Sequence, residues 1–353
     1  MKTKAKILIC YNSPVSIFPI YNGKPADGES DSKDLSEHSF ASNMIGIENY
    51  LKTFFTDVSS LAVDRDVNRT IREITQYDPD AIVNFVESVE GITYYEYCMA
   101  GLYELLGYNY TGNMPSTLGN CLNKLRTKEI LYSTGIKTPG AVMLSPGQKF
   151  TSKDINLNYP LILKLIDEDA SIGISENSVV DNYRELRKHY GFLTETYKKS
   201  VIVEEYIQGR ELNCAVLGGK PLPVSEIDFT GLPGNFPKIV TYDGKWIEGS
   251  TYYNHTKPVC PANITDEIKK KIEDTAVKAY GALKCRDYAR VDVRLADDGT
   301  PYVIEINPNP DVSSDSGFAR AAAATGKSYD ELLFTITNFA LQRKYDDTQN
   351  KTF

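Results

Sequence analysis

Histidine and tryptophan are scarce in this chain, with three and one copies among 353 residues. The histidines are widely spaced, at His38, His189 and His255, which leaves little material for a histidine metal site or a catalytic triad. The six cysteines include no CxxC pair, so the sequence indicates neither a zinc site nor a disulfide framework. We expect the thiols to be free and buried.

Long hydrophobic runs are absent as well. No stretch approaches the roughly 18 apolar residues that span a bilayer, and the apolar run Ile7–Cys10 is too short for the core of a signal peptide. We therefore expect a cytoplasmic protein. The formal net charge of −8 argues against non-specific binding to nucleic acid or to an anionic membrane.

Two common nucleotide-binding motifs are also missing. The first predicted strand is followed by Asn12-Ser13-Pro14 instead of GxGxxG, and no GxxxxGK[ST] occurs anywhere in the chain. The first absence argues against a dinucleotide-dependent oxidoreductase. The second means that any bound phosphates must be met by separate cations in a local pocket.

The first 115 residues alternate between predicted strands and helices. Strands are expected at 6–10, 57–63, 80–85 and 108–112, and helices at 42–55, 67–77 and 94–106. Such alternation is typical of an α/β fold with a doubly wound parallel sheet. Between the first strand and the first helix, residues 12–39 form an unusually long loop, which favours a lid or a disordered segment.

The rest of the chain predicts two α+β lobes. A helical pattern runs from Ser116 to Thr134, and short strands and a helix follow up to about residue 205. Antiparallel strands, a helix at 265–283, a hairpin and two closing helices come after it. We therefore expect three domains, at 1–115, 116–205 and 206–345.

The most informative stretch, Tyr288–Asn307, predicts a β-hairpin, because Asp298-Gly299 lies between two runs rich in β-forming residues. If those two residues are the loop, the opposed pairs are Arg290 with Asn307, Asp292 with Glu305, Val291 with Ile306, and Val293 with Ile304. Side chains alternate between the faces of a strand, so the first two pairs share a polar face and the last two an apolar one.

The polar face of this hairpin predicts a magnesium site. Asp292 and Glu305, directly opposed, should repel each other unless a cation lies between them. Oxygen ligands from Asp, Glu and Asn suit Mg²⁺, which commonly binds one or two carboxylates together with phosphate oxygens. The alternative is a solvated strand face on which Arg290 neutralises the acids.

Six segments of the chain resemble, in order, the ATP-grasp ligases and within them the D-alanine–D-alanine ligases. They are residues 105–112, 123–128, 159–164, 203–211, 290–292 and 305–307. The resemblance implies that the two α+β lobes form an ATP-grasp fold behind a Rossmann-like substrate domain. It also implies ATP-driven amide formation between two amino acids, a role in peptidoglycan biosynthesis, and a homodimer formed through the first domain.

The resemblance also implies the roles of individual residues. Those that bind ATP would be Lys124, Lys164, Lys245, Ser171, Glu204, Glu205, Tyr206, Ile207 and Glu211. Two Mg²⁺ ions, or Mn²⁺ in their place, would bind Asp292, Glu305 and Asn307. One substrate carboxylate would attack the γ-phosphorus to give an acyl phosphate. An amine would then attack that intermediate, and Arg290 would stabilise the oxyanion.

The substrate end of the site is less similar to the family. Ala170 and Trp246 stand where a serine and a tyrosine normally help to close a loop over the phosphates, so that closure cannot form here. Phe85 stands in place of a family histidine. These differences put D-alanine in doubt as either substrate.

The residues expected to bind the second substrate are Ser316, Gly317, Asp311 and Trp246. Ser316 and Gly317 match the family pair that holds that substrate's carboxylate, whereas Asp311 and Asp315 are additional acids. They indicate either an acceptor with an extra cationic or polar group or N-capping of the following helix.

Three functions stay open from the sequence. The first is a ligase of the D-alanine–D-alanine type, and the second is an ATP-grasp ligase for a different amino acid or peptide pair. The third is a nucleotide-binding module without chemistry. The intact set of Arg290, Asp292, Glu305 and Asn307 argues against the third, because a protein that only binds nucleotide could lose Arg290 freely.

Overall fold

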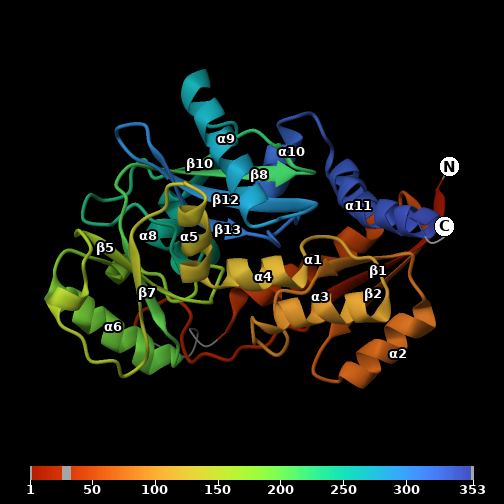
Figure 1. The fold of residues 1–353 in the computed structure, drawn as a ribbon, viewed down its shortest axis with the longest axis horizontal. Coiled ribbons are helices and arrows are strands. Elements are labelled where there is room, and N and C mark those ends of the chain that lie inside the picture. The colour runs from red at the N-terminus through yellow and green to blue at the C-terminus, as the bar shows by residue number, and fades with distance from the viewer. Residues whose placement is uncertain (1, 26–32, 351–353) are drawn as a thin grey trace.

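The computed structural model describes residues 2–25 and 33–350, so residues 26–32 of the predicted long loop lie outside the described part of the chain. The N-terminal part is a parallel sheet in the order β2-β1-β3, and Figure 1 shows β1 and β2 with α1, α2 and α3 near them. Its strands are β1 (Thr3–Asn12), β2 (Phe55–Val63) and β3 (Ala81–Phe85), and its helices are α1 (Leu35–Leu51), α2 (Val67–Tyr77) and α3 (Tyr95–Leu106). The predicted α/β fold is confirmed. The strand expected at 108–112 is reduced to a single bridge between Ile82 and Tyr110.

The first helix begins earlier than predicted. Asp34 caps α1, because its carboxylate accepts hydrogen bonds from the backbone N–H of Ser36 (3.0 Å) and of Glu37 (3.3 Å). The end of the predicted long loop is therefore helical.

The single helix predicted at 116–134 is two helices, α4 (Pro115–Leu122) and α5 (Lys124–Ser133). Asn123 is extended, and its side chain accepts a hydrogen bond from the N–H of Arg126 (3.0 Å), which caps α5. The N–H of Lys124 leaves the helical pattern to bond the carbonyl of Ile166 (3.1 Å). The break places Lys124 at the start of α5, next to the central sheet.

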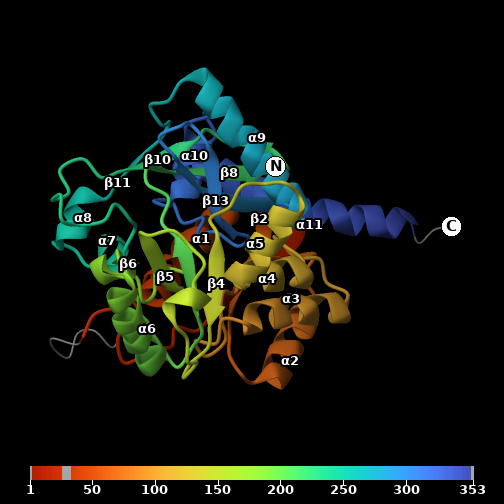
Figure 2. The same ribbon diagram turned by 60° about the vertical axis from the view of Figure 1, so that its left-hand side comes forward.

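The central part of the chain is a small sheet in the order β4-β7-β5-β6, and Figure 2 shows α6 beside it. The elements are β4 (Ala141–Leu144), β5 (Leu161–Leu165), β6 (Val179–Val180), α6 (Tyr183–Tyr197) and β7 (Val201–Glu205). Its three pairings are antiparallel. The side chains of α6 and of the buried strands pack into one apolar core.

The C-terminal part is a larger antiparallel sheet in the order β11-β10-β8-β12-β13, with β9 paired to β8. Its strands are β8 (Arg210–Leu217), β9 (Lys220–Pro221), β10 (Ser225–Asp228), β11 (Lys257–Val259), β12 (Tyr288–Leu295) and β13 (Pro301–Asn307). Its helices are α7 (Tyr242–Trp246), α8 (Thr251–His255), α9 (Asp266–Ala282), α10 (Gly317–Ala323) and α11 (Tyr329–Asn350).

The hairpin of β12 and β13 keeps the predicted register at one end only. Arg290 pairs with Asn307 and Asp292 pairs with Glu305, as predicted. Beyond a bulge after Asp292, Val293 pairs with Val303, so its predicted pairing with Ile304 is wrong. The two-residue loop is also wrong, because the last pair, Leu295 with Pro301, leaves residues 296–300 in the turn. The longer turn shifts the register by one residue, and the bulge restores it.

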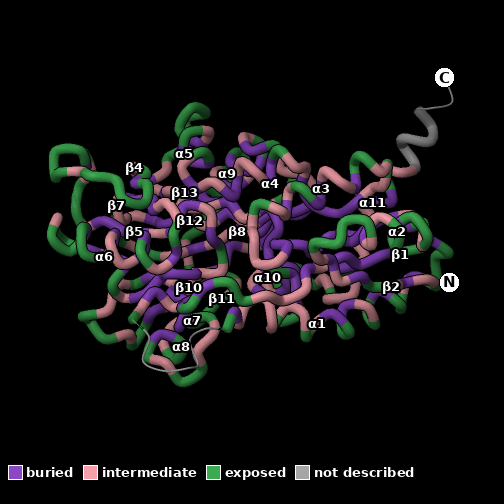
Figure 3. Tube along the Cα trace, turned by 90° about the horizontal axis from the view of Figure 1, so that it is seen from below, coloured by how far each residue is buried: buried purple, intermediate pink, exposed green. Residues whose placement is uncertain are grey.

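The N-terminal sheet and the C-terminal lobe share one apolar core. Its buried members from the two parts include Ile7, Ile9, Val83, Ala215, Tyr288, Leu332 and Ile336. Figure 3 shows buried segments running through the strands of both sheets. Among the described residues, no helix is long and apolar enough to cross a membrane.

An ion pair fastens the last helix to this shared core. The guanidinium of Arg343 on α11 donates to both carboxylate oxygens of Asp287, at 2.6 and 2.9 Å. The same carboxylate accepts the N–H of Gly112 at 2.8 Å. Asp287 therefore joins α11, the end of the N-terminal part and the start of β12.

We expect the Asp287→Asn variant to lower the free energy of unfolding by about 2 kcal/mol, because one oxygen that accepts from Arg343 becomes a donor. Urea unfolding followed by circular dichroism measures the change. Asp297→Asn, at an exposed position in the hairpin turn, is the matched control and should leave stability unchanged. Equal stability of the two variants would contradict this role of Asp287.

Candidate active site

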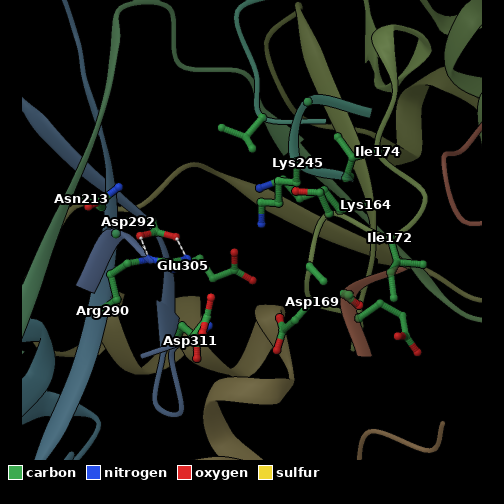
Figure 4. Close-up of a pocket in the computed structure, with 18 of the residues that line it drawn as sticks. Lys164, Asp169, Ile172, Ile174, Asn213, Lys245, Arg290, Asp292, Glu305 and Asp311 are labelled. Carbon is green, nitrogen blue, oxygen red and sulfur yellow. Dashed lines mark hydrogen bonds and ion pairs between the residues drawn. The ribbon is translucent and has the colours of Figure 1, made fainter. Parts of the chain in front are cut away.

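A cavity of about 730 Å³ lies between the central lobe, the hairpin and the N-terminal part. Every residue predicted for the site from the sequence lines this cavity. Figure 4 shows the charged side chains of the hairpin on one side and Lys164, Lys245 and Asp169 on the other. The structure therefore brings together segments that are separated by more than 190 positions in the sequence, from Lys124 to Gly317.

The polar face of the hairpin carries charges that are already paired. Arg290 donates from Nε and Nη2 to the two oxygens of Asp292, at 2.7 and 2.8 Å. Glu305, opposite Asp292, lies 3.1 Å from Nζ of Lys124. Within the described residues no group of three or more His, Cys, Asp and Glu side chains is arranged to hold a metal ion, so a metal here would need the amide oxygen of Asn307 as well. Arg290 therefore neutralises Asp292, whereas the partner of Glu305 is Lys124 and not Arg290.

Lys124 is only 6% exposed and connects both sides of the cavity. Besides Glu305, its amine donates to the carbonyl of Glu168 (2.6 Å) and lies 3.4 Å from Asp169. Burial alone would lower the pKa of Lys124, but Glu305 and Asp169 outweigh it and raise the pKa. Burial would likewise raise the pKa of Glu305, yet Lys124 and Lys164 bring it down to about 2. Both groups are therefore charged at neutral pH.

Glu204 at the end of β7 is held by two lysines. Its oxygens lie 3.2 Å from Nζ of Lys128 and 3.1 Å from Nζ of Lys164, and the residue is 1% exposed. Burial opposes ionisation, but the two cations lower the pKa of Glu204. Sequence reasoning assigned no role to Lys128. The signal that could have identified Lys128 is its position four residues after Lys124 on α5, which places both lysines on the same helix face.

Arg294 is a second residue that sequence reasoning missed. It is 3% exposed, and it donates to the carbonyl of Ile207 (2.9 Å) and to the carboxylate of Glu211 (3.1 Å). Its guanidinium also lies over the ring of Tyr206. The period-two alternation that groups Arg290 with Asp292 on β12 extends to Arg294, and this pattern could have identified it. Glu205, another residue predicted to bind ATP, accepts hydrogen bonds from the backbone and the side chain of Asn158.

Lys245 on α7 points into the cavity (Figure 4). Within the described residues its amine makes no hydrogen bond or ion pair. Its pKa is lowered, first by desolvation and then by the positive charge of Arg290. A cation in this position favours an anionic ligand.

The acids near α10 do not cap that helix. The cap is Ser316, whose hydroxyl accepts the N–H of Ala319 (3.1 Å). Asp311 instead accepts the N–H and the hydroxyl of Ser313, at 2.8 and 2.9 Å. The alternative of N-capping by Asp311 or Asp315 is therefore wrong.

Two of the residues that depart from the family pattern, Ala170 in the loop after β5 and Trp246 on α7, contact each other. Nε1 of Trp246 donates to the carbonyl of Ala170 at 3.1 Å. A contact between the two positions thus exists without the expected serine and tyrosine. Phe85, the third departure, is buried against Phe40 in the shared core.

The sequence is similar to known ligases over most of its length. Residues 131–338 match the family model described as D-ala D-ala ligase C-terminus. A D-alanine–D-alanine ligase of Bordetella petrii is 33% identical over 256 residues, 71% of this chain and 74% of that protein. An uncharacterized protein of Sinorhizobium fredii is 29% identical over 80% of this chain and 82% of that protein.

Solved structures agree on the fold. The D-alanine–D-alanine ligase of Bacillus anthracis, complexed with ATP, superposes with a TM-score of 0.73 at 23% identity, covering 97% of this chain and all of that one. The VanG D-Ala:D-Ser ligase of Enterococcus faecalis gives 0.67 at 21% identity, covering 94% and 98%. The resemblance and the fold class predicted from the sequence are confirmed, and the chain belongs to the D-alanine–D-alanine ligase family of ATP-grasp ligases.

Proposed function

We propose that this protein is an ATP- and Mg²⁺-dependent ligase that joins the carboxylate of one amino acid to the amine of another through an acyl phosphate. The observation that carries the proposal is the distribution of charge in the cavity. Carboxylates and Arg290 on the hairpin face the lysines of the opposite side, as a site for phosphates and a metal ion requires. The family relationship supports the same activity.

ATP would occupy the side of the cavity formed by β5, β7 and β8. We propose that Glu204, Glu205, Tyr206 and Ile207 bind adenine, and that Glu211 binds the ribose. The hydrogen bonds of Arg294 support this, because they fix both the Ile207 carbonyl and the Glu211 carboxylate. The phosphates would meet Ser171 and the amines of Lys124, Lys164 and Lys245.

Asp292, Glu305 and Asn307 fit Mg²⁺, because they are oxygen donors on one face of two adjacent strands. When bound, the metal would neutralise charge on the phosphate oxygens. The chain itself orients the donors, since Arg290 holds Asp292 and Lys124 holds Glu305. The geometry therefore supports the metal set predicted from the sequence, with Mn²⁺ as an alternative ion.

Arg290 is proposed as the catalytic residue. It lies beside the metal-binding face and lines the cavity, where its guanidinium would stabilise the oxyanion formed when the amine attacks. Removing such a donor raises a barrier by about 3 to 4 kcal/mol. Exclusion of water from the closed cavity would protect the acyl phosphate from hydrolysis.

Ser316, Gly317, Asp311 and Trp246 are proposed to bind or border the second substrate. Asp311, Ala170 and Trp246 line the cavity and differ from the family pattern, so a substrate pair other than two D-alanines is the second candidate. The fold accommodates such a change, since the VanG protein of Enterococcus faecalis, which shares it, is a D-Ala:D-Ser ligase.

We further propose that residues 1–115, 116–205 and 206–345 act as three domains. Closure of the central domain over the other two would complete the site. A homodimer through the first domain and a cytoplasmic location are part of the same proposal.

The proposed function is tested by Mg²⁺-dependent ADP release with D- and L-amino acids and dipeptides, singly and in pairs. We expect one pair to raise ADP release about tenfold or more over ATP alone, and mass spectrometry to show a new amide. Glu305→Gln should reduce this rate about a hundredfold, because it removes a ligand charge and the partner of Lys124.

Glu129→Gln, at an exposed position on α5, is the matched control and should keep full activity. Bound ATP without a rise in ADP release for any pair would contradict the ligase proposal in favour of the nucleotide-binding module.

Discrimination between ATP and 2′-deoxy-ATP tests the proposed ribose site. A hydrogen bond to a charged group is worth about a factor of ten, so the unmodified protein should have a KM about tenfold higher for 2′-deoxy-ATP. In Glu211→Gln the ratio of the two KM values should fall towards one. A ratio that does not change would place the ribose elsewhere.

A further inference from the structure

The loop that follows β5 has an unusual backbone. Ala170 and Ser171 are consecutive, carry Cβ atoms and adopt left-handed conformations, with φ of +54° and +62°. Non-glycine residues rarely adopt this region, and each costs roughly 1 kcal/mol there. Contacts from outside the loop must therefore stabilise it.

Several contacts hold the loop, and three of them lie at its start, at its end and in its middle. At its start, Lys124 donates to the carbonyl of Glu168 (2.6 Å). At its end, the N–H of Gly173 donates to the carbonyl of Tyr21 (2.8 Å). In the middle, the indole N–H of Trp246 donates to the carbonyl of Ala170 (3.1 Å). The middle contact is the one made by the strained residue itself.

The loop leaves two backbone donors facing no acceptor. The N–H groups of Ile172 and Ile174 bond within the loop, to Asp169 and Ser171. Within the part of the chain that the structure describes, the N–H groups of Ala170 and Ser171 have no such partner. Both residues line the cavity, and consecutive free N–H groups of this kind form a common anion-binding arrangement.

The contact with Trp246 needs no serine. An indole has a single N–H donor, and here it is used on a backbone carbonyl, which alanine supplies as well as any residue. The ring packs beside Tyr242 and against the core of the central lobe, to which Ala170 also belongs. Trp246 and Ala170 therefore match each other. Because the indole N–H is occupied by this contact, only the ring could contact a substrate.

We propose that Trp246 is a positioning residue for the phosphates of ATP: by its hydrogen bond to Ala170 it keeps two backbone N–H groups of the loop turned to the ligand. The inference rests on the proposed function and refines the substrate-binding role expected for Trp246. The side chain acts through the loop rather than on the amino acid substrate.

The first test is the Trp246→Phe variant, which keeps an aromatic ring and removes the donor. We expect ATP with Mg²⁺ to bind about fivefold more weakly in titration calorimetry, and the KM for ATP to rise by a similar factor. Tyr132→Phe is the control, because Tyr132 is 82% exposed and lies outside the cavity. Unchanged ATP affinity in Trp246→Phe would overturn the proposal.

A second variant separates positioning from general damage to the site. Glycine adopts the left-handed region without strain, so Ala170→Gly should reduce the need for the tryptophan contact. We expect Ala170→Gly in the Trp246→Phe background to recover at least half of the lost ATP affinity. A loss that Ala170→Gly leaves undiminished would overturn the positioning role.

Fluorescence of the unmodified protein gives a readout that needs no turnover. Trp246 is the single tryptophan of the chain, so all tryptophan emission reports on this contact. ATP with Mg²⁺ should change the emission, whereas adenosine, which lacks phosphates, should not. Calorimetric ATP binding without a change in emission, or an equal change with adenosine, would overturn the inference alone. Absence of any ATP binding would overturn the proposed function together with it.

Discussion

The buried ammonium of Lys124 is the group around which the cavity is organised. An unpaired charge in such a position is costly, so the hairpin and the loop after β5 must both approach it. Glu305 arrives from β13 and the Glu168 carbonyl from the loop after β5. The break at Asn123 starts α5 at Lys124, whose N–H bonds the carbonyl of Ile166 just after β5, and so brings the Lys124 amine close to both groups. One cation therefore sets the distance between the two sides of the site.

The same principle extends along the cavity, where several acids are paired with a cation before any ligand binds. Glu204 is paired with two lysines, and Glu211 is paired with Arg294. Lys128 and Lys164 lower the pKa of Glu204 against the effect of burial, whereas at Glu211 burial outweighs Arg294 and raises the pKa. The pairs also keep the side chains in fixed positions, which reduces the reorganisation that binding requires. Under the proposed function, an incoming phosphate would compete with carboxylates for lysines that are already in place.

The sequence was most informative where a local rule decides the structure. Alternation along a strand predicts the shared face of Arg290 and Asp292, and it would also have revealed Arg294. It failed where distant contacts decide. The helix break at Asn123 is held by a hydrogen bond from the N–H of Lys124 to the distant carbonyl of Ile166, and its local sign was only that asparagine is a favoured N-cap residue. The contact between Trp246 and Ala170 joins two residues 76 positions apart, and only their joint departure from the family pattern pointed to it.

In a regular hairpin the length of the turn decides which face each side chain occupies, and the bulge in this hairpin removes that dependence. In a regular antiparallel pair, a change of one residue in the turn moves every later side chain to the opposite face. Here β12 is held by β8 on its other edge, and the extra residue in β13 absorbs the length of the turn. The turn at 296–300 can therefore vary in length during evolution, or carry an inserted peptide in an engineered protein, while Glu305 and Asn307 keep their places in the site.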